Sequence, residues 1–353
     1  MRHTVFTTDF LNKLDANAII YAPETRSFLS DKILSKKHKS FFSKHLNSIN
    51  PELIHSHYIT DAIVFRPLTK NLDIPKICSC YGYDVSVIPV KFKHFYKPFY
   101  NRIFAEYDLF LAMTNEMKKD LLEMGCPENK IVVHYHGIDT KRFDFPRTYD
   151  LKNDTLTLLT IASLYEVKGH LSVLKALKQI TAEKPNLNIT YNIVGEGPLK
   201  QELEQFILKN SLTKVVNFCG AIKHGPKFNE HLIQADIFLH PSITTKDNDK
   251  EGIPGALVEA MASGLPTIAT YHGGIPAVVT NLETGFLVKE HDSKTIGEHI
   301  IKLYENEDLR RNIGAEAKNF ATKNLDVYEK AALLKNIYNE AIDRNQKLKL
   351  ESK

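Results

Sequence analysis

The sequence EGIPGALVEAMASGLP, residues 251–266, decides the fold prediction. Glycine and proline residues lie at both ends of this stretch, and the residues between them predict a helix over 253–263. Glu251 precedes this helix, and Glu259 is expected about two turns further on, where eight steps of 100° return near the same face. Two carboxylates that face one cleft suit a ligand rich in hydroxyl groups, because each accepts two hydroxyl hydrogen bonds. The alternative is a pair of solvated glutamates on a helix surface.

The start of this predicted helix favours the same ligand. Residues 252–255 open the helix, and the first N–H groups of a helix have no partner within it. Such groups bind hydroxyl or phosphate oxygens.

On both sides of this stretch, short apolar runs alternate with longer amphipathic ones. We predict a first series of strands over residues 18–21, 53–56, 76–79, 109–113 and 130–134, and a second series over 156–162, 188–194, 215–219, 237–240, 267–270 and 285–288. Between the strands we predict helices, among them 171–183, 199–210, 293–305 and 309–323. This alternation is typical of a layered α/β protein with parallel sheets.

The length of 353 residues favours two domains, at about 150 residues each. The polar stretch 148–154 separates the two series of strands, so we predict one α/β domain over residues 1–150 and a second over 151–324. We predict that residues 325–353 form a helix that packs back toward the first domain and ends in a solvated tail. Because ligands of open α/β sheets bind at the carboxyl ends of the strands, we expect the site in the cleft between the domains.

The charge is distributed unevenly along the chain. Of 46 basic and 42 acidic residues, residues 1–150 hold 21 and 17, so the whole net charge of +4 lies in the first half. This excess is too small for a dedicated nucleic-acid binder, and no nucleic-acid-binding module is recognisable. It suits an acidic or membrane-bound partner.

Other compositional features exclude several classes of protein. Hydrophobic residues at 43% and charged residues at 25% exclude a disordered or collagen-like chain. No apolar run approaches the roughly 18 residues that span a bilayer, and no signal-peptide pattern is present. The four cysteines are too few and too scattered for a disulfide framework. These features predict a cytoplasmic protein.

Residues 251–266 closely resemble the E-x7-E motif of the retaining glycosyltransferases of family 4, which have the α/β GT-B fold of two Rossmann-like domains that face each other across a cleft. Further blocks follow the order of that family: GID at 137–139 with Phe143, VGEGP at 194–198, ADIFLHPS at 235–242, HGGIP at 272–276 and TGFLV at 284–288. The matches extend from about residue 51 to 314. The loop before Glu251 looks most like that of bacterial exopolysaccharide transferases of the colanic acid or amylovoran type.

This resemblance implies a function. The chain would transfer a sugar from a nucleoside diphosphate sugar to a hydroxyl group of a glycan or lipid-linked acceptor, with retention of configuration, in cell-surface polysaccharide biosynthesis. The first domain would bind the acceptor and the second the donor. No metal and no cofactor are implied, and the enzyme would work in the cytoplasm or at the inner face of the membrane.

The resemblance also assigns residues. Glu251, the catalytic candidate, would hold the hydroxyls of the donor sugar, and Glu259 would bind the ribose. Lys168, within YEVKG at 165–169, would neutralise the diphosphate as the leaving group gains charge. The rest of the implied donor site consists of Gly195, Glu196 and Gly197, which would let the backbone approach the nucleotide, and of Gly252, Ile253, Pro254 and Gly255 at the helix start.

The sequence departs from the family pattern at three places. Ser163 stands where the family has an arginine, and serine cannot make the bidentate phosphate contact, so another cation substitutes or phosphate binding depends on Lys168 and helix N-termini. Tyr81 and Gly82 replace the usual His-Gly pair; we place both near the acceptor or sugar, with Asp84 either beside them or in a structural role. Residues 1–21 contain no glycine, so we predict a first domain shortened at its start.

Three short patterns could bind a metal, and we favour a different reading of each. The Asp247-x-Asp249 pattern is expected to be a solvated loop. His55 and His57 would face one side of a strand, without a third ligand. Cys78-x-Cys80 lacks the second half of a zinc site.

The run KFKHFYKPFY, residues 91–100, interleaves cations and aromatic rings. It either lies on an anionic membrane surface near a lipid-linked acceptor or forms a helix or loop with core aromatics and solvated lysines. Two other functions remain open for the whole chain: a nucleotide-sugar epimerase of the same fold, and a non-catalytic nucleotide-sugar-binding subunit.

Overall fold

The computed structural model of the chain describes residues 51–351. Contacts divide the chain into two compact units: an N-terminal unit, Met1–His136 with Tyr328–Lys353, and a C-terminal unit, Gly137–Val327. The strand predicted over 18–21 and the predicted shortening of the first domain lie outside the described residues.

The two units meet in sequence after His136, ahead of the boundary that we placed at residue 150. The reason is that the segment after Gly137 packs on the C-terminal unit. The guanidinium of Arg147 donates hydrogen bonds to the carbonyl oxygens of Ser263 at 2.8 Å and Ala235 at 2.8 Å. A polar composition alone did not reveal this packing.

The N-terminal unit contains a parallel sheet in the order β1-β2-β3-β4. Its strands are β1 (Ile54–His57), β2 (Lys76–Ser79), β3 (Leu109–Ala112) and β4 (Ile131–Val133). The connecting helices are α3 (Ile59–Thr69), α4 (Tyr83–Phe92), the 3-10 turn η1 (Lys93–Tyr96), α5 (Lys97–Glu106) and α6 (Asn115–Glu123). The side chain of Thr114 caps α6 by accepting a hydrogen bond from the N–H of Met117.

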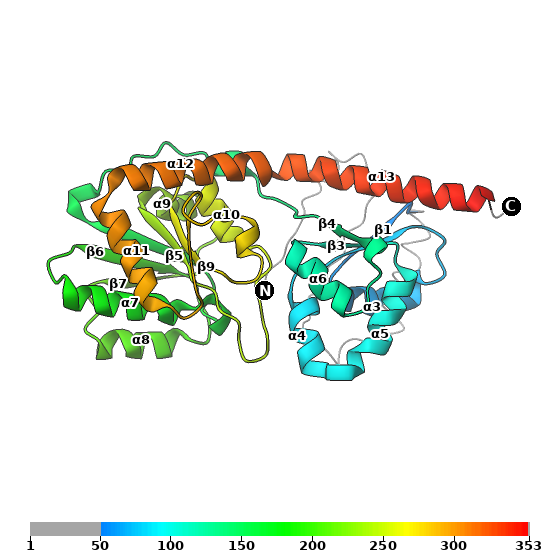
Figure 1. Cartoon of the computed structure of the whole chain (residues 1–353), viewed down its shortest axis with the longest axis horizontal. Coiled ribbons are helices and arrows are strands. Elements are labelled where there is room, and N and C mark those ends of the chain that lie inside the picture. The colour runs from blue at the N-terminus through cyan, green and yellow to red at the C-terminus, as the bar shows by residue number, and fades with distance from the viewer. Residues whose placement is uncertain (1–50, 352–353) are drawn as a thin grey trace. The chain divides into compact units, whose positions relative to one another are not determined.

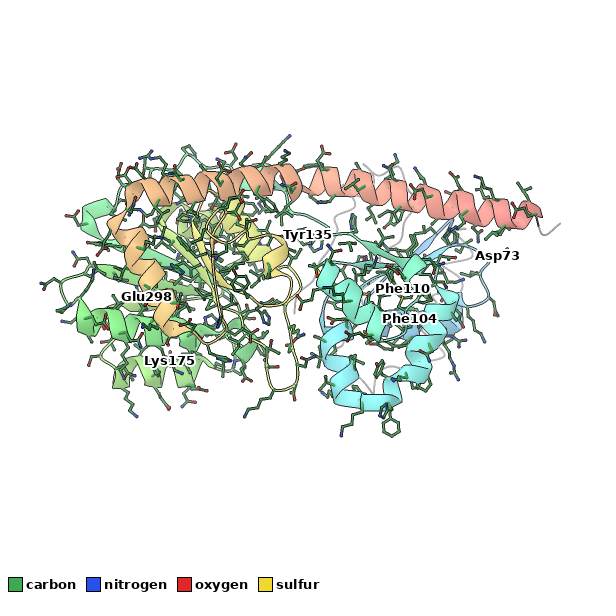
Figure 2. The ribbon with its side chains drawn as sticks, viewed as in Figure 1. Asp73, Phe104, Phe110, Tyr135, Lys175 and Glu298 are labelled. Carbon is green, nitrogen blue, oxygen red and sulfur yellow. The ribbon has the colours of Figure 1, made fainter. Side chains whose placement is uncertain are left out.

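Alternate residues of this sheet pack on opposite sides. On one side, Ile77 and Leu111 contact Ala341 of the long helix α13 (Val327–Glu351). On the other side, the rings of Phe104 and Phe110 meet edge to face at 5.1 Å in the interior of the unit (Figure 2). The N-terminal sheet is therefore covered by the α13 segment of the same unit on one face and by its connecting helices on the other.

The C-terminal unit contains a parallel sheet of six strands in the order β10-β9-β8-β5-β6-β7. The strands are β5 (Leu156–Ile161), β6 (Ile189–Val194), β7 (Val216–Gly220), β8 (Ile237–His240), β9 (Thr267–Thr270) and β10 (Phe286–Val288). The helices are α7 (His170–Glu183), α8 (Lys200–Lys209), α9 (Pro226–Gln234), α10 (Gly255–Ala262), α11 (Ser293–Glu305) and α12 (Glu307–Asn324). Helices α7, α8 and α11 cover one face, and α9 and α10 cover the other (Figure 1).

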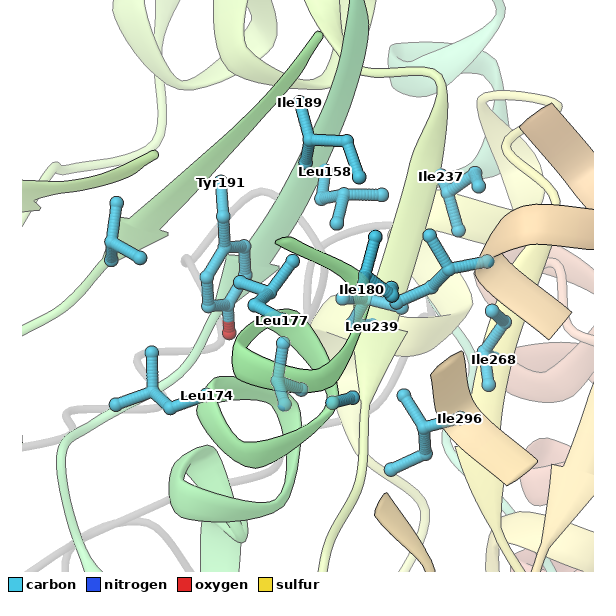
Figure 3. Close-up of a cluster of buried hydrophobic side chains, with 14 of the residues drawn as sticks. Leu158, Leu174, Leu177, Ile180, Ile189, Tyr191, Ile237, Leu239, Ile268 and Ile296 are labelled. Carbon is cyan, nitrogen blue, oxygen red and sulfur yellow. The ribbon is translucent and has the colours of Figure 1, made fainter. Parts of the chain in front are cut away.

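The core of the C-terminal unit lies between its sheet and α7. Leu174, Leu177 and Ile180 of α7 pack against Leu158 and Tyr191 of the strands (Figure 3). The spacing of the three α7 residues places them on one helix face, which explains why the periodicity of residues 171–183 predicted this helix. The strands predicted over 76–79, 237–240 and 267–270 have the predicted bounds.

The prediction for the helix at 253–263 needs a correction. Helix α10 begins at Gly255, because Pro254 has an extended backbone and acts as the N-cap. Glu259 is therefore just over one turn into the helix instead of two, and the count of 100° per residue from Glu251 does not apply. Within the described range, no helix is both long enough and apolar enough to cross a bilayer.

Candidate functional site

The strand order of the C-terminal sheet reverses between β5 and β8. From β5 the chain continues outward to β6 and β7, and it then returns to β8 on the other side of β5. Ligands of open α/β sheets bind at the carboxyl ends of the strands at such a point. Lys168, in the turn η5 (Glu166–Lys168) after β5, and Ser242, after β8, both lie at this edge.

The two loops at this edge touch closely. Gly169 has φ of +64°, and a Cβ added to it would lie 1.8 Å from the carbonyl oxygen of Pro241. Only glycine fits this position, and it brings the loop of Lys168 against the end of β8.

The carboxylate of Glu251 is bound through one of its oxygens. Oε1 receives hydrogen bonds from Lys168 Nζ at 2.5 Å and from Ser242 Oγ at 2.9 Å, and His240 Nε2 lies 3.4 Å away. In the described part of the chain, no hydrogen bond is made to the second oxygen, Oε2. The side chains of Lys168 and Glu251 are only 7% and 11% exposed. The structure therefore brings together the two residues that the sequence assigned to the diphosphate and the donor sugar.

The environment keeps Glu251 ionised. Burial alone would raise the pKa of its carboxyl group, but the charge of Lys168 and the hydrogen bond from His240 outweigh burial and hold the pKa well below the usual range. Burial lowers the pKa of His240, so this ring is neutral and donates from Nε2. A carboxylate of this kind is a strong hydrogen-bond acceptor and a weak base.

Sequence reasoning missed His240 and Ser242 as site residues. Both belong to the ADIFLHPS block: His240 is the last residue of the predicted strand over 237–240, and Ser242 follows it. Their position at a strand's carboxyl end was the available signal.

Glu259, on α10, has a different partner from Glu251. His224 Nε2 lies 2.9 Å from Glu259 Oε1, and the hydrogen bond to Glu259 raises the pKa of His224. The ring of His224 in turn lies against Phe228, with ring centroids 4.4 Å apart. The side chain of Glu259 is 12% exposed, so both carboxylates are largely buried, each beside a basic partner.

The start of α10 is open. No side chain caps it, and a Cβ added at Gly255 would meet no atom within 4 Å. The N–H groups of its first turn can donate hydrogen bonds to the oxygens of an anionic or hydroxylated ligand. The other residues predicted at this helix start are less open. Ile253 is buried, and the carbonyl oxygen of Gly252 accepts a hydrogen bond from the Gly274 N–H at 3.1 Å. Gly255 is therefore the residue of the predicted stretch 252–255 that faces open space.

The glycines after β6 have a structural use that the sequence did not predict. A Cβ at Gly195 would lie 1.9 Å from the carbonyl oxygen of Ala162, and one at Gly197 would lie 2.5 Å from that of Leu164. The close backbone approach that they permit is thus to the loop after β5. Glu196, between them, is paired with Lys200 at 3.2 Å on the surface.

Ser163 places its carbonyl oxygen 3.1 Å from Nε2 of His170, at the start of α7. Among the lysine and arginine side chains of residues 51–351, Lys168 alone forms an ion pair with Glu251. Burial lowers the pKa of His170 to about 4, so this ring supplies no positive charge near pH 7.

The predicted acceptor-side residues lie in the N-terminal unit. Asp84 is fully buried, and its carboxylate accepts hydrogen bonds from the N–H groups of Ile59 at 2.9 Å and Tyr81 at 3.1 Å. Of the two roles left open for Asp84, this geometry favours the structural one. Tyr81 Oη lies 2.5 Å from His57 Nδ1, and Gly82, with φ of +120°, is the N-cap of α4.

The patterns considered for metal binding have other partners. His55 and His57 face one side of β1 with their rings stacked at 4.6 Å, and His55 contacts Tyr338 at 2.5 Å and Ser79 at 2.8 Å. Asp249 lies in a turn where its N–H donates to Thr245. In the part of the chain that the structure describes, no three His, Cys, Asp or Glu side chains are grouped to hold a metal ion.

Comparison with known families gives two matches that together span most of the chain. Residues 141–320 match the family described as "Glycosyl transferases group 1". Residues 1–142 match the family described as "Glycosyltransferase Family 4".

Two curated relatives are similar over part of their length. The putative colanic acid biosynthesis glycosyltransferase WcaL of Escherichia coli is 36% identical over 220 residues, which are 62% of this chain and 53% of WcaL. The amylovoran biosynthesis glycosyltransferase AmsK of Erwinia amylovora is 34% identical over 238 residues, which are 67% of this chain and 57% of AmsK. The chain thus spans little more than half the length of these relatives. The predicted likeness to exopolysaccharide transferases of these two types is confirmed.

A solved structure shares the fold. HepE of Anabaena in complex with UDP superimposes with a TM-score of 0.74 at 18% identity, over 86% of this chain and 82% of HepE. This similarity and the parallel sheets with flanking helices confirm the predicted α/β class and GT-B fold.

Proposed function

The chain belongs to the family of glycosyl transferases group 1, and on this basis we propose that it transfers a sugar from a nucleoside diphosphate sugar to a hydroxyl group of a glycan or lipid-linked acceptor in polysaccharide biosynthesis. The relatives WcaL and AmsK are named for exopolysaccharide biosynthesis, and HepE was solved with UDP. The donor site is proposed at the carboxyl edge of β5 and β8, and the acceptor site in the N-terminal unit.

The observation that supports this most directly is the Lys168–Glu251 pair at the point where the strand order reverses. The buried ammonium of Lys168 suits a diphosphate, whose leaving-group charge it would stabilise. Oε2 of Glu251 is left for a sugar hydroxyl, and Glu259 for the ribose. The open start of α10 adds unpaired N–H groups beside Glu251.

We further propose that the reaction retains the configuration at the anomeric carbon. Glu251 is a poor nucleophile because Lys168 and its hydrogen-bond donors hold its pKa low. The acceptor oxygen would bond to the anomeric carbon on the face from which the diphosphate leaves, and the acceptor proton would pass to the leaving diphosphate. Glu251 would hold the donor sugar throughout.

Contact with an anionic membrane is proposed through the region of α4, η1 and α5. Phe95 is 82% exposed and Phe99 51% exposed, although Tyr100 of the same run is buried. The side chains of Lys91, Lys93 and Lys97 are exposed among them. Exposed aromatic rings interleaved with lysines suit the interface of an anionic bilayer, where a lipid-linked acceptor would lie.

Donor turnover distinguishes the proposed transferase from the two alternatives. The purified chain is incubated with UDP-glucose or GDP-mannose, and the sugar products are followed by proton NMR. Slow hydrolysis that first releases the α-anomer, without an epimer, supports a retaining transferase. Formation of an epimeric nucleotide sugar supports the epimerase, and tight binding without turnover supports the non-catalytic subunit.

A further inference from the structure

Three neighbouring strand ends of the C-terminal sheet are joined by the side chain of Glu290. Thr244 follows β8, His272 follows β9 and Glu290 follows β10. Oε2 of Glu290 accepts a hydrogen bond from the Thr244 N–H at 2.8 Å. Oε1 accepts from the Thr244 hydroxyl at 2.9 Å and lies 2.7 Å from His272 Nδ1.

This arrangement fixes the tautomer of His272. Because Nδ1 faces a carboxylate, it carries the hydrogen, and Nε2 of a neutral ring is left as an acceptor. Nε2 accepts a hydrogen bond from the backbone N–H of Glu251 at 3.0 Å. The side chain of His272 is fully buried, so water does not replace either partner.

The backbone carbonyl of Glu251 is contacted by the two glycines that follow His272. The N–H of Gly274 donates to the carbonyl oxygen of Glu251 at 3.2 Å. Gly273 has φ of +49°, and a Cβ there would lie 2.2 Å from the same oxygen. Residues 272–274 therefore bind both the N–H and the carbonyl of Glu251, and this close fit excludes a side chain at Gly273.

We propose that His272 and Glu290 are positioning residues, which fix the backbone of Glu251 and so aim its free Oε2 at the donor sugar. Neither residue needs to touch the substrate. The proposal rests on the proposed function only in taking Glu251 as the residue that binds the donor sugar. It also gives a role to the HGGIP block at 272–276, which resembled the family pattern but had no assigned role.

Hydrogen exchange tests the positioning role without a ligand. In His272→Asn, the shorter side chain keeps a donor near the position of Nδ1 but loses the acceptor for the Glu251 N–H. Amide hydrogen exchange of the peptide around residues 244–252 is expected to become about fivefold faster or more, while exchange in β5 and β6 stays unchanged. The control is His291→Asn, since His291 is exposed in the loop beside Glu290.

An unchanged exchange rate at residues 244–252 in His272→Asn would overturn the proposal. If that variant does not fold, Glu290→Ala tests the same link from its other end. Its control is Glu283→Ala, at an exposed glutamate.

A binding test asks whether His272 acts through Glu251. Affinity for UDP-glucose and GDP-mannose is measured by calorimetry for the wild type, His272→Asn, Glu251→Ala and the double variant. For whichever donor binds, we expect His272→Asn to weaken affinity about tenfold in the wild-type background and less than twofold in the Glu251→Ala background, because coupled residues are not additive.

Equal losses in the two backgrounds would show that His272 supports only the fold, and would refute the positioning role. Failure of the wild type to bind either donor would count against the proposed function instead, and the exchange measurement would still decide the positioning role.

Discussion

Lys168 Nζ and Glu251 Oε1 lie 2.5 Å apart although 83 residues separate them in the chain. Both side chains are almost fully removed from water, so each charge depends on the other. Ser242 and His240 add hydrogen bonds to the same oxygen and leave Oε2 without one among the described residues. The candidate donor site is therefore organised by an internal ion pair.

The two carboxylates of the E-x7-E motif are expected to be needed for donor use. Glu251→Ala and Glu259→Ala should each reduce donor affinity or transfer at least tenfold, or about 1.4 kcal/mol. Isothermal titration with the donor and initial transfer rates check this. The control is Glu298→Ala, on the outer face of α11 (Figure 2). Normal binding and transfer by both site variants would disprove the assignment.

Removal of the cation is expected to destabilise the fold in a pH-dependent way. Lys168→Met leaves the buried carboxylate of Glu251 without its counter-charge, and we expect a loss of about 3 kcal/mol in the free energy of unfolding at pH 7. In the wild type, the pKa of Glu251 is depressed, so its contribution is complete above its usual value of 4.5 and is lost as the pH falls through the folded pKa.

In Lys168→Met, burial without the lysine raises the pKa of Glu251, so protonation relieves the penalty as the pH falls toward 4.5. The difference in unfolding free energy between wild type and variant should therefore shrink from pH 7 to pH 5, as measured by urea unfolding. The double variant Lys168→Met/Glu251→Gln should recover most of the loss at pH 7. A difference that is constant with pH would contradict this account.

Gly195 and Gly255, two glycines of the candidate donor site, are expected to respond differently to alanine. Gly195→Ala places a Cβ against the carbonyl oxygen of Ala162, and we expect a loss of about 2 kcal/mol or more in unfolding free energy. Gly255→Ala meets open space at a helix start and should change stability by less than about 1 kcal/mol. Thermal or urea unfolding compares the two variants. Equal stability of both would show that the loop after β6 adapts to a side chain.

Membrane contact is expected to depend on the exposed aromatic rings of η1 and α5. Phe95→Ser with Phe99→Ser should reduce sedimentation with vesicles of phosphatidylcholine and phosphatidylglycerol at least tenfold, because two exposed rings are removed from the interface. Charge reversal of Lys91, Lys93 and Lys97 should do the same and leave binding to pure phosphatidylcholine unchanged. The matched control is Leu208→Ser, at a residue 68% exposed in the C-terminal unit. Undiminished sedimentation of the lysine variant would exclude this surface.

The sequence predicted the order and type of most described elements because each is set by local patterns. Short apolar runs identified the strands, and the amphipathic stretch over residues 171–183 identified a helix. The boundary of α10 was wrong at its start, since Pro254 is the N-cap and not part of the helix. The unit boundary was less visible, because Arg147 binds backbone carbonyls that no local pattern predicts.

Lys168 and Glu251 were assigned from a family resemblance, whereas their contact, and the part played by His240 and Ser242, came from the tertiary structure. The sequence by itself determined the strands that Lys168, Ser242, His272 and Glu290 follow, and the helix that Glu251 precedes. Which strand ends are neighbours depends on the order in the sheet, and β8 lies beside β5 only because hydrogen bonding and the packing of the helices select that order. That order brings Lys168 to Glu251 and Glu290 to His272, and burial then gives these charges and hydrogen bonds their strength.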